Sequence, residues 1–507
     1  MADESQSGVI AFLANPATHG GTPVRRIDTH GAIVFLAGDR AYKLKRAVRF
    51  DYMDFSTAER RRTACEAELK LNKRSAPDIY LDVVAITESC AGLVLGGDGP
   101  VRDWVVVMRR FDEALLFDRL AREGHLTDAM VRDLADAIRR LHGEAAVHRR
   151  PDAAGHMAGL VTMALSELRR FVPRVFKGAA VDALESALQA RLREDAALIE
   201  RRSGAGHVRR LHGDLHLRNI FLDGARPVLF DALEFNEDLA IGDCLYDVAF
   251  VLMDLLRHDL GGLANGLLNA WLSDADDDAG LQLLPLFMAL RAAIRAHVGA
   301  TAAEGSDDGA RDEQEAEARG YLDLAQRLLA PCPAQLIAVG GYSGTGKSTV
   351  ARGLAPAQGR APGAVVLRSD EIRKALFGVP STHRLPPEAY RGDVSKRVYE
   401  TLYGRAESLL RAGQSVVADA LFSRPADRLA IETIARQCGV PFRGFWLSAP
   451  YEVLAARIAA RRNDASDATV DVLKQQMETP PGPMDWYTLD AALRPDDVLK
   501  SALAASS

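Results

Sequence analysis

The sequence has little cysteine and no paired cysteine motif. Among its 507 residues there are five cysteines, and no two of them form a C-x-x-C pair. Disulfide scaffolds and structural zinc sites are built from cysteines at short, regular spacings. We therefore expect neither framework, and the cysteine usage favours a reducing, cytoplasmic compartment.

Long apolar runs are absent as well. No stretch reaches the roughly 18 apolar residues that a membrane-spanning helix needs. The first residues, MADESQSG, lack the basic region and apolar core of a secretory signal. The sequence therefore predicts no membrane span, no secretory signal and no membrane partner.

Aromatic residues make up only 6% of the chain and do not alternate with basic clusters. The net charge is −6, and residues 334–507 hold 22 Lys and Arg against 18 Asp and Glu. Nucleic-acid-binding surfaces need concentrated positive charge, often with stacking aromatic side chains. A nucleic acid is therefore not the expected partner, and small molecules are.

The hydrophobic pattern divides the chain into two domains. Residues 1–25 show no periodic segment and are expected to be loose. From residue 26, short alternating strands with one helix are followed by helices and a loop-and-strand block, which predicts one domain over 26–330. Pro331 and Pro333 end its last helix, and a second domain over 331–507 starts with a buried strand.

A glycine-rich loop follows the first strand of the second domain. The motif G-Y-S-G-T-G-K-S-T, starting at residue 341, lies between an apolar strand and a helix. Its glycines let backbone N–H groups point at phosphate oxygens, and the helix N-terminus adds partial positive charge. We expect Lys347 to contact the β- and γ-phosphates of ATP and Ser348 to bind Mg²⁺. The expected ATP-binding residues are Gly341, Ser343, Gly344, Thr345, Gly346, Lys347, Ser348 and Thr349.

Two more strands of this domain are each followed by an aspartate. Ligands of open α/β sheets bind at the carboxyl ends of the strands. Asp370 is therefore expected to orient or deprotonate an acceptor hydroxyl, and Asp419 to hold Mg²⁺. Arg373, one helical turn after Asp370, is expected to grip the acceptor. An arginine at position 457, 461 or 462 would act from a lid on the transferring phosphoryl group.

These motifs make residues 334–480 similar to the P-loop kinases that include polynucleotide kinase, gluconate kinase and zeta toxin. The segments that carry the resemblance are GYSGTGKST, RSDEIRKALFG, SVVADALFSRPADR and RIAARRNDASDA. The resemblance implies a P-loop NTPase fold with a parallel sheet flanked by helices. It also implies that Asp370 acts on the acceptor hydroxyl, that Arg373 places the substrate, and that Arg461 is the lid arginine.

A second constellation lies in the first domain, in the segment H-G-D-L-H-L-R-N that starts at residue 212. A kinase catalytic loop needs an Asp base with an Asn metal ligand five residues later, and Asp214 and Asn219 have this spacing. A further metal-binding Asp should follow a short hairpin. Asp231 does so, after a turn at Asp223 and Gly224.

The parts that come before this loop are in the order found in kinases. Lys43, on a predicted strand, is expected to hold the α- and β-phosphates of ATP. A glutamate of the next helix should pair with it, and we expect Glu68 rather than Glu66. The adenine ring is expected at a hinge that begins at Met108.

These residues resemble the aminoglycoside phosphotransferase and choline-kinase-like family over about 27–330. The segments that carry the resemblance are AYKLKR, LHGDLHLRNIF, LFDALEF and GDCLYDVAF. The resemblance implies a bilobal, protein-kinase-like fold in an α/β multidomain chain. It implies that Asp214 is the catalytic base, that Asn219 and Asp231 bind Mg²⁺, and that Lys43 binds phosphate.

Together the two blocks predict a bifunctional ATP- and Mg²⁺-dependent phosphotransferase that acts on hydroxyls of small polar metabolites, such as sugars or amino sugars. One alternative is a single P-loop kinase regulated by a ligand-sensing, kinase-like domain. Another is an ATP-driven switch that phosphorylates no metabolite. Asp370 with Arg373 favours a kinase over a switch, because hydrolysis alone needs no acceptor-binding pair.

Overall fold

The structure is a computed structural model that describes residues 6–50, 53–272, 277–380, 383–460 and 466–506. Its contacts divide the chain into two compact units. The first contains residues 1–258 and 287–325, and the second contains residues 259–286 and 326–507. The second unit therefore includes a segment that precedes the boundary expected at residue 331.

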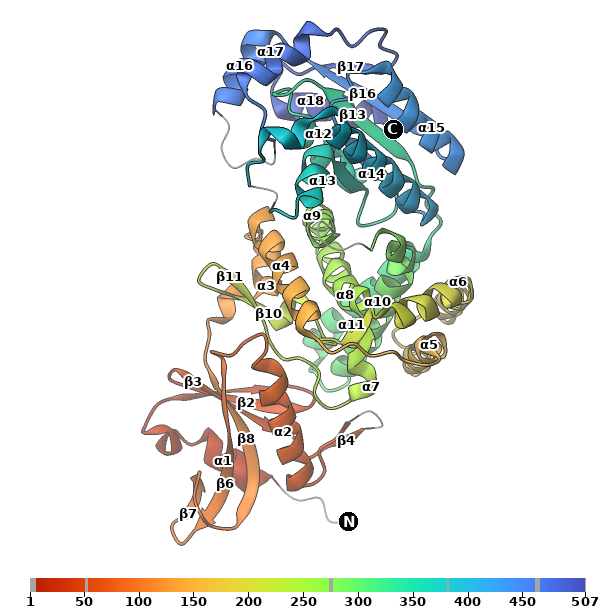
Figure 1. Ribbon diagram of the computed structural model, residues 1–507. Coiled ribbons are helices and arrows are strands. Elements are labelled where there is room, and N and C mark those ends of the chain that lie inside the picture. Colours follow the sequence, from red (N-terminus) through yellow and green to blue (C-terminus); the bar gives the residue numbers. More distant parts are fainter. Residues whose placement is uncertain (1–5, 51–52, 273–276, 381–382, 461–465, 507) are drawn as a thin grey trace. The chain divides into compact units, whose positions relative to one another are not determined.

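The first unit begins with a six-stranded antiparallel sheet in the order β1-β2-β3-β8-β6-β7. Helix α2 (Ala58–Asn72) packs against β8 and β6, and Thr57 caps its N-terminus through its side chain (Figure 1). The strands are β1 (Val24–Asp28), β2 (Ala32–Ala37), β3 (Arg40–Lys45), β6 (Tyr80–Ser89), β7 (Gly92–Leu95) and β8 (Val101–Arg109).

The expectation of a loose N-terminal segment is wrong for the part of it that the structure describes. Residues Ser7–Ala14 form helix α1, and Pro16–His19 form the 3₁₀ helix η1. Val9 and Leu13, one helical turn apart, are buried in one cluster with Phe35 of the sheet. This helix is too short to show an apolar period in the sequence, and its burial against the sheet stabilises it.

Helices dominate the rest of the first unit. Between them lie two two-stranded sheets, β9 (Val208–Arg210) with β12 (Ile241–Asp243), and β10 (Ile220–Asp223) with β11 (Arg226–Leu229). The main helices are α3 (Phe117–Arg122), α4 (Asp128–Glu144), α5 (Ala153–Arg169), α6 (Gly178–Ala205), α8 (Cys244–Arg257), α10 (Leu284–Ala303) and α11 (Asp308–Leu329). A small sheet followed by a helical lobe agrees with the kinase-like fold expected for this part.

The stretch Asp278–Ala303 is long and apolar enough to cross a membrane by composition alone. However, 72% of its most apolar window is buried inside the protein. Core helices pass the same test, so the burial accounts for the apolar composition of this stretch.

The second unit is built on a five-stranded parallel sheet in the order β14-β15-β13-β16-β17. Its strands are β13 (Leu336–Gly341), β14 (Val365–Arg368), β15 (Val416–Asp419), β16 (Phe442–Ser448) and β17 (Tyr487–Asp490). Its helices include α9 (Gly261–Leu272), α12 (Lys347–Leu354), α13 (Ser369–Leu376), α14 (Gly392–Arg411), α15 (Pro425–Cys438), α16 (Tyr451–Ala460), α17 (Val470–Glu478) and α18 (Pro495–Ser506). This arrangement confirms the expected P-loop fold.

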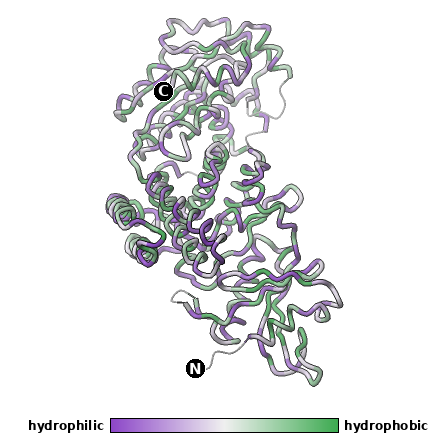
Figure 2. Tube along the Cα trace, turned by 180° about the vertical axis from the view of Figure 1, so that it is seen from behind, coloured by the Kyte–Doolittle hydropathy of each residue, from purple (hydrophilic) through white to green (hydrophobic). Residues whose placement is uncertain are grey.

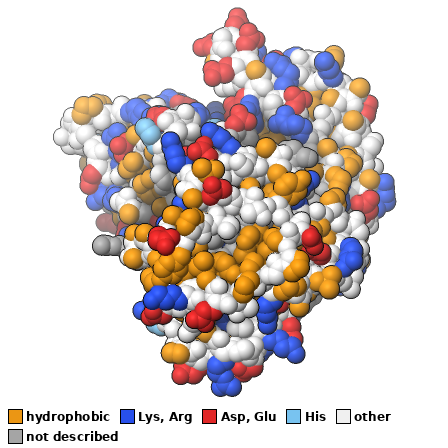
Figure 3. Space-filling view, turned by 90° about the horizontal axis from the view of Figure 1, so that it is seen from above, with side chains coloured by type: hydrophobic (Ala, Val, Ile, Leu, Met, Phe, Trp, Pro, Cys, Tyr) orange, Lys and Arg blue, Asp and Glu red, His pale blue; other side chains and the backbone are white. Residues whose placement is uncertain are grey.

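Burial follows the hydropathy pattern. All six residues of β13 are buried, as are all four of β15, so the centre of the parallel sheet is covered on both faces. Hydropathy alternates along many of the helices, as expected for elements with one buried side (Figure 2). On the face drawn in Figure 3, basic and acidic side chains are intermixed around a hydrophobic band, and no basic track gathers there.

Candidate active sites

The loop of the first unit that was expected to be catalytic brings Asp214 and Asn219 together. The Asn219 side-chain amide donates hydrogen bonds to the Asp214 backbone oxygen at 2.9 Å and to its Oδ2 at 3.0 Å. Asp247 of α8 holds the loop in place, because its carboxylate accepts hydrogen bonds from the backbone N–H groups of His212 and Gly213 at 2.8 and 3.0 Å. A carboxylate that binds two backbone donors fixes the loop conformation.

Asp231 lies just after β11 in an unusual backbone conformation. Its φ of 62° is in the left-handed region, which non-glycine residues rarely adopt. Its backbone N–H donates to the Tyr80 hydroxyl at 3.0 Å, and its carboxylate lies 2.5 Å from Lys43 Nζ. Strain of this kind persists where surrounding contacts hold it, and it is common at functional sites.

The structure pairs Lys43 with Glu68, as expected, at 2.7 Å. Glu66 instead forms a surface pair with Arg62. Sequence reasoning missed a second lysine, Lys45, which also pairs with Glu68 and with Glu234. Residues i and i+2 of a strand point to the same face, and this rule would have identified Lys45.

Two lysines therefore share one fully buried glutamate. Burial alone would raise the pKa of Glu68, but Lys43 and Lys45 outweigh it and lower that pKa to about 2. The carboxylate is thus ionised at neutral pH, and it keeps Lys43 extended toward Asp231. The arrangement can place a cation beside a phosphate group.

Replacing Glu68 by Gln is expected to destabilise the protein by about 3 kcal/mol, because it leaves two buried ammonium groups short of a counter-charge. Glu66→Gln is the matched control. It removes a carboxylate two residues away that is 54% exposed and pairs only at the surface, and its effect should stay within about 0.5 kcal/mol. Urea denaturation of the full chain measures both values. Equal losses of unfolding free energy in the two variants would contradict the buried ion pairs assigned to Glu68.

Asp214 is expected to act as a base, and its surroundings favour the ionised form. Burial opposes ionisation, but His216, Arg295 and His212 outweigh it and hold the pKa of Asp214 well below its usual range. His216 Nε2 lies 3.4 Å from Asp214 Oδ2. No motif pointed to Arg295, because it comes from α10, about 80 residues downstream of the loop.

Met108 is buried near the end of β8, one residue before the strand ends at Arg109. It pairs with Ala41 of β3 and with Tyr80 of β6, so it lies between the strand of Lys43 and the strand of Tyr80. The expected hinge for adenine begins here, and its role stays a prediction.

In the second unit the glycine loop joins β13 to α12, as predicted. Gly341, Gly344 and Gly346 have φ values of 146°, 86° and 86°, which side chains disfavour. A Cβ at Gly344 would lie 2.8 Å from the Leu454 backbone oxygen, so this position also needs glycine for space. The loop therefore has the shape that lets backbone N–H groups approach an anion closely.

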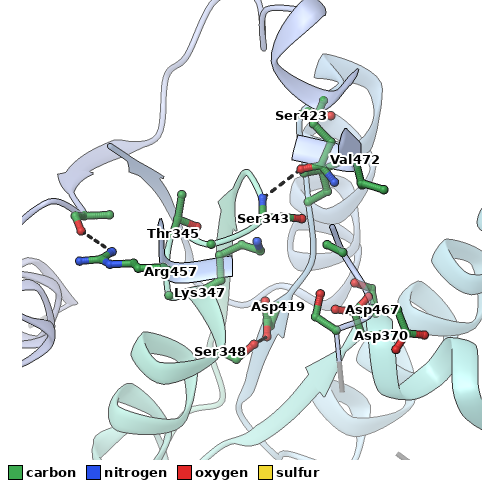
Figure 4. A pocket seen from close by; sticks show the side chains of 18 of the residues that line it. Ser343, Thr345, Lys347, Ser348, Asp370, Asp419, Ser423, Arg457, Asp467 and Val472 are labelled. Atoms are coloured by element: carbon green, nitrogen blue, oxygen red, sulfur yellow. Dashed lines mark hydrogen bonds between the residues drawn. The ribbon is translucent and has the colours of Figure 1, made fainter. Parts of the chain in front are cut away.

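The remaining motif residues surround the same space (Figure 4). Lys347 Nζ donates to the Tyr342 backbone oxygen at 3.0 Å, and Thr345 Oγ1 donates to the same oxygen at 2.8 Å. The Ser343 backbone N–H donates to Gln476 Oε1 of α17 at 3.0 Å. Sequence reasoning missed Gln476, which lies far from every motif.

Ser348 and Asp419, the two expected metal ligands, are in direct contact. Ser348 Oγ donates to Asp419 Oδ2 at 2.6 Å. A hydroxyl and a carboxylate beside a phosphate loop fit Mg²⁺, which prefers oxygen ligands. Arg368, whose role was not predicted, donates to Ser348 Oγ at 3.0 Å and lies 3.3 Å from Asp419 Oδ2.

A cavity of about 900 Å³ opens next to the loop, and Asp370 and Arg373 line it together with the motif residues. Burial and, after it, the charge of Asp419 raise the pKa of Asp370. Arg373 donates to the Ala389 backbone oxygen at 2.6 Å and lies over the Tyr390 ring. Its buried Nε has no partner among the described residues. The predicted base and acceptor-binding arginine therefore lie on one cavity wall.

The expected lid arginine, Arg461, lies outside the described residues, as does Arg462. Arg457, the third position considered, lines the cavity and donates to the Ala491 backbone oxygen at 2.7 Å. Asp467, just beyond, accepts from the Tyr390 hydroxyl at 2.7 Å and lies 3.2 Å from Lys374 Nζ. Asp467 thus connects the chain just before α17 to α13, the helix that carries Arg373.

Two family models match the chain. The model of the phosphotransferase enzyme family covers residues 58–284, and a model described as an AAA domain covers residues 336–482. The first contains the Asp214 loop, and the second contains the glycine loop and Asp370.

Solved structures to which the chain is similar include a choline/ethanolamine kinase family protein from Mesorhizobium loti. It is 15% identical with a TM-score of 0.38, covering 63% of this chain and 97% of that one. A gluconokinase from Sinorhizobium meliloti is 24% identical with a TM-score of 0.25, covering 34% of this chain and 90% of that one. The domain assignment rests on the two family models.

Relatives match almost the whole chain. Uncharacterized proteins from Mycobacterium tuberculosis and Mycobacterium bovis are each 31% identical over 456 residues, which is 88% of this chain and 88% of theirs. The match runs through both domains rather than through one of them. The chain therefore belongs to the same family as these mycobacterial proteins, as a kinase in which a phosphotransferase-family domain precedes a P-loop kinase domain.

Proposed function

We propose that the chain is a bifunctional ATP- and Mg²⁺-dependent kinase that phosphorylates hydroxyl groups of small polar metabolites, such as sugars or amino sugars. The observation that supports this proposal is that each unit brings together an aspartate proposed as base and side-chain oxygens that would bind Mg²⁺. In the first unit these are Asp214, Asn219 and Asp231. In the second unit they are Asp370, Ser348 and Asp419.

In the first unit, Asp214 would take the proton from the acceptor hydroxyl as that oxygen attacks phosphorus. Its low pKa keeps it ionised, and Asn219 fixes its orientation. Lys43 would hold phosphate oxygens of ATP, positioned by Glu68. Mg²⁺, held by Asn219 and Asp231, would neutralise phosphate charge when bound.

In the second unit, the glycine loop and Lys347 would hold the phosphates of ATP, and Asp370 would accept the proton of the acceptor hydroxyl. Arg373 lines the same cavity as Asp370, and its guanidinium group would donate to the acceptor. Ser348 and Asp419 fit the same metal ion. An acceptor-binding pair beside the base supports phosphotransfer rather than ATP hydrolysis alone.

The two reactions should lose rate at different acidic pH values. A base works only when ionised, so each rate falls as the pH drops through the pKa of its own aspartate. The pKa of Asp370 is raised and that of Asp214 is lowered. As the pH is lowered, the rate of the Lys347-dependent reaction should therefore fall at a higher pH than the rate of the Asp214-dependent reaction. Profiles of kcat/KM against pH for both acceptors measure this order, and the reverse order would contradict the two assignments.

The proposal is tested by incubating the full chain with Mg²⁺, γ-labelled ATP and a panel of sugars, amino sugars, nucleosides and polyols. Label should appear in two chemically different acceptors. Label in a single acceptor would favour one P-loop kinase with a sensing domain. ADP release without any labelled acceptor would favour an ATP-driven switch.

A further inference from the structure

The edge of the parallel sheet in the second unit is covered by a helix that lies before the P-loop domain in the sequence. Strand β14 is one of the two edge strands of the sheet, and its inner side pairs with β15. Helix α9 belongs to the same compact unit, although residues 58–284 match the phosphotransferase family model. An edge strand presents N–H and C=O groups that need partners.

The side chain of Asn269 supplies these partners as a neighbouring strand would. Its Oδ1 accepts from the Val366 backbone N–H at 2.7 Å, and its Nδ2 donates to the Ala364 backbone oxygen at 3.3 Å. Asn265, one helical turn earlier and only 3% exposed, donates to the same Ala364 oxygen at 2.9 Å. Asn269 thus satisfies the Val366 donor of the edge, and Asn265 and Asn269 together satisfy the Ala364 acceptor.

Other contacts fix the same segment to the unit. Asp278 accepts two hydrogen bonds from Arg405 of α14, at 2.7 and 2.8 Å. The Leu281 backbone oxygen accepts from Arg360 at 2.8 Å. A two-point arginine–carboxylate pair is a specific, directional contact. The segment is therefore an integral part of the second unit.

The position of Asp370 depends directly on β14. The strand ends at Arg368, and α13 begins at the next residue, so no loop separates the held strand from the expected base. Asn269 and Leu272 of α9 also line a small cavity together with Glu371 and Ile372 of α13. A shift of α9 along the edge would reach both the strand and the helix that carries Asp370.

We propose that Asn269 is a positioning residue of the P-loop kinase, and that it acts on Asp370 through β14. The proposal extends the proposed function of that site, on which its kinetic test rests. It predicts that the chemical step is affected more than ATP binding. The glycine loop lies on β13 and α12, two strands away from the sheet edge, and β14 reaches it through the Arg368 contact with Ser348 rather than through Asn269.

The test compares Asn269→Leu, Asn269→Asp and Gly262→Ala in the full chain. The leucine removes the hydrogen bonds to Val366, Ala364 and Asn265. The aspartate keeps the acceptor for Val366 but loses the donor to Ala364 and Asn265. Gly262→Ala is the control, because Gly262 is exposed on the same helix and a Cβ added there would meet no neighbouring atom within 4 Å. Hydrogen exchange is followed in peptides that cover 364–368 and 369–376.

For Asn269→Leu we expect about tenfold faster exchange in both peptides, the size expected for one lost hydrogen bond. The exchange rates of Asn269→Asp should lie between those of Asn269→Leu and wild type, and the rates of Gly262→Ala should match wild type. Faster exchange in 364–368 alone would show that Asn269 only stabilises the edge, and unchanged exchange in both peptides would show that it does not hold the strand. Either result overturns the proposal.

Kinetics give the second readout. Asn269→Leu should lower kcat of the Lys347-dependent reaction about tenfold, while KM for ATP stays within about twofold. A parallel loss in ATP affinity would indicate general loosening and contradict the positioning role. If no acceptor shows Lys347-dependent transfer, the proposed function fails, while the exchange result still decides whether Asn269 holds the strand and α13.

Discussion

Asp214→Asn should lower kcat of the first-unit reaction by about 10³-fold, because it removes the base proposed for that unit while leaving the loop in place. Asparagine can still accept the hydrogen bond that Asn219 donates to Oδ2, and the Asn219 bond to the backbone oxygen is unaffected. ATP affinity and thermal stability should therefore change little. Initial rates with the first-unit acceptor, together with ATP titration, measure the effect.

Asp238→Asn is a suitable control for this variant. Asp238 is in the same unit, and its 77% exposed side chain pairs with Arg150. Its removal should leave the rate within about twofold, as expected for a surface ion pair. A rate for Asp214→Asn within tenfold of wild type would show that another group takes the proton, or that the step needs no base.

Lys347→Ala should lower the second-unit reaction by about 100- to 1,000-fold, because it deletes a positive charge that the transition state needs beside the phosphates. Lys347 begins α12, and the structure holds its Nζ at the Tyr342 oxygen inside the glycine loop. The loss should appear mainly in kcat with the second-unit acceptor. Steady-state kinetics at saturating ATP measure it.

Lys396→Ala is the matched lysine control for this prediction. Lys396 lies on α14 of the same unit, with a 78% exposed side chain and a weak pair to Glu400 at 3.8 Å. Its replacement should leave both reactions unchanged. If Lys347→Ala kept more than a tenth of the wild-type rate, the glycine loop would not be the phosphate site.

The sequence predicted the spatial arrangement of the candidate residues best where a short, fixed spacing sets it. Asp214 and Asn219 lie five residues apart on one loop, and the glycine loop is continuous, so local geometry dictates both. The choice of Glu68 over Glu66 also agrees with the observed pairing. These residues could be found because one strand, turn or helix sets their relative positions.

Other contacts depend on tertiary packing and left no local pattern. Arg295 reaches the surroundings of Asp214 from a distant helix, and Gln476 meets the glycine loop from α17. Asn269 was missed for the same reason, since its partner strand lies about a hundred residues further along the chain. The N-terminal helix α1 was missed because tertiary burial, not periodicity, stabilises it.

The central claim of two independent kinase sites is tested most directly by one comparison. Both transfer reactions are measured with labelled ATP in wild type, Asp214→Asn and Lys347→Ala, with both acceptors present. The account predicts that each variant loses transfer to one acceptor and keeps the other within about twofold. Loss of all transfer in Lys347→Ala, with Asp214→Asn unaffected, would contradict it and make the first unit a sensor.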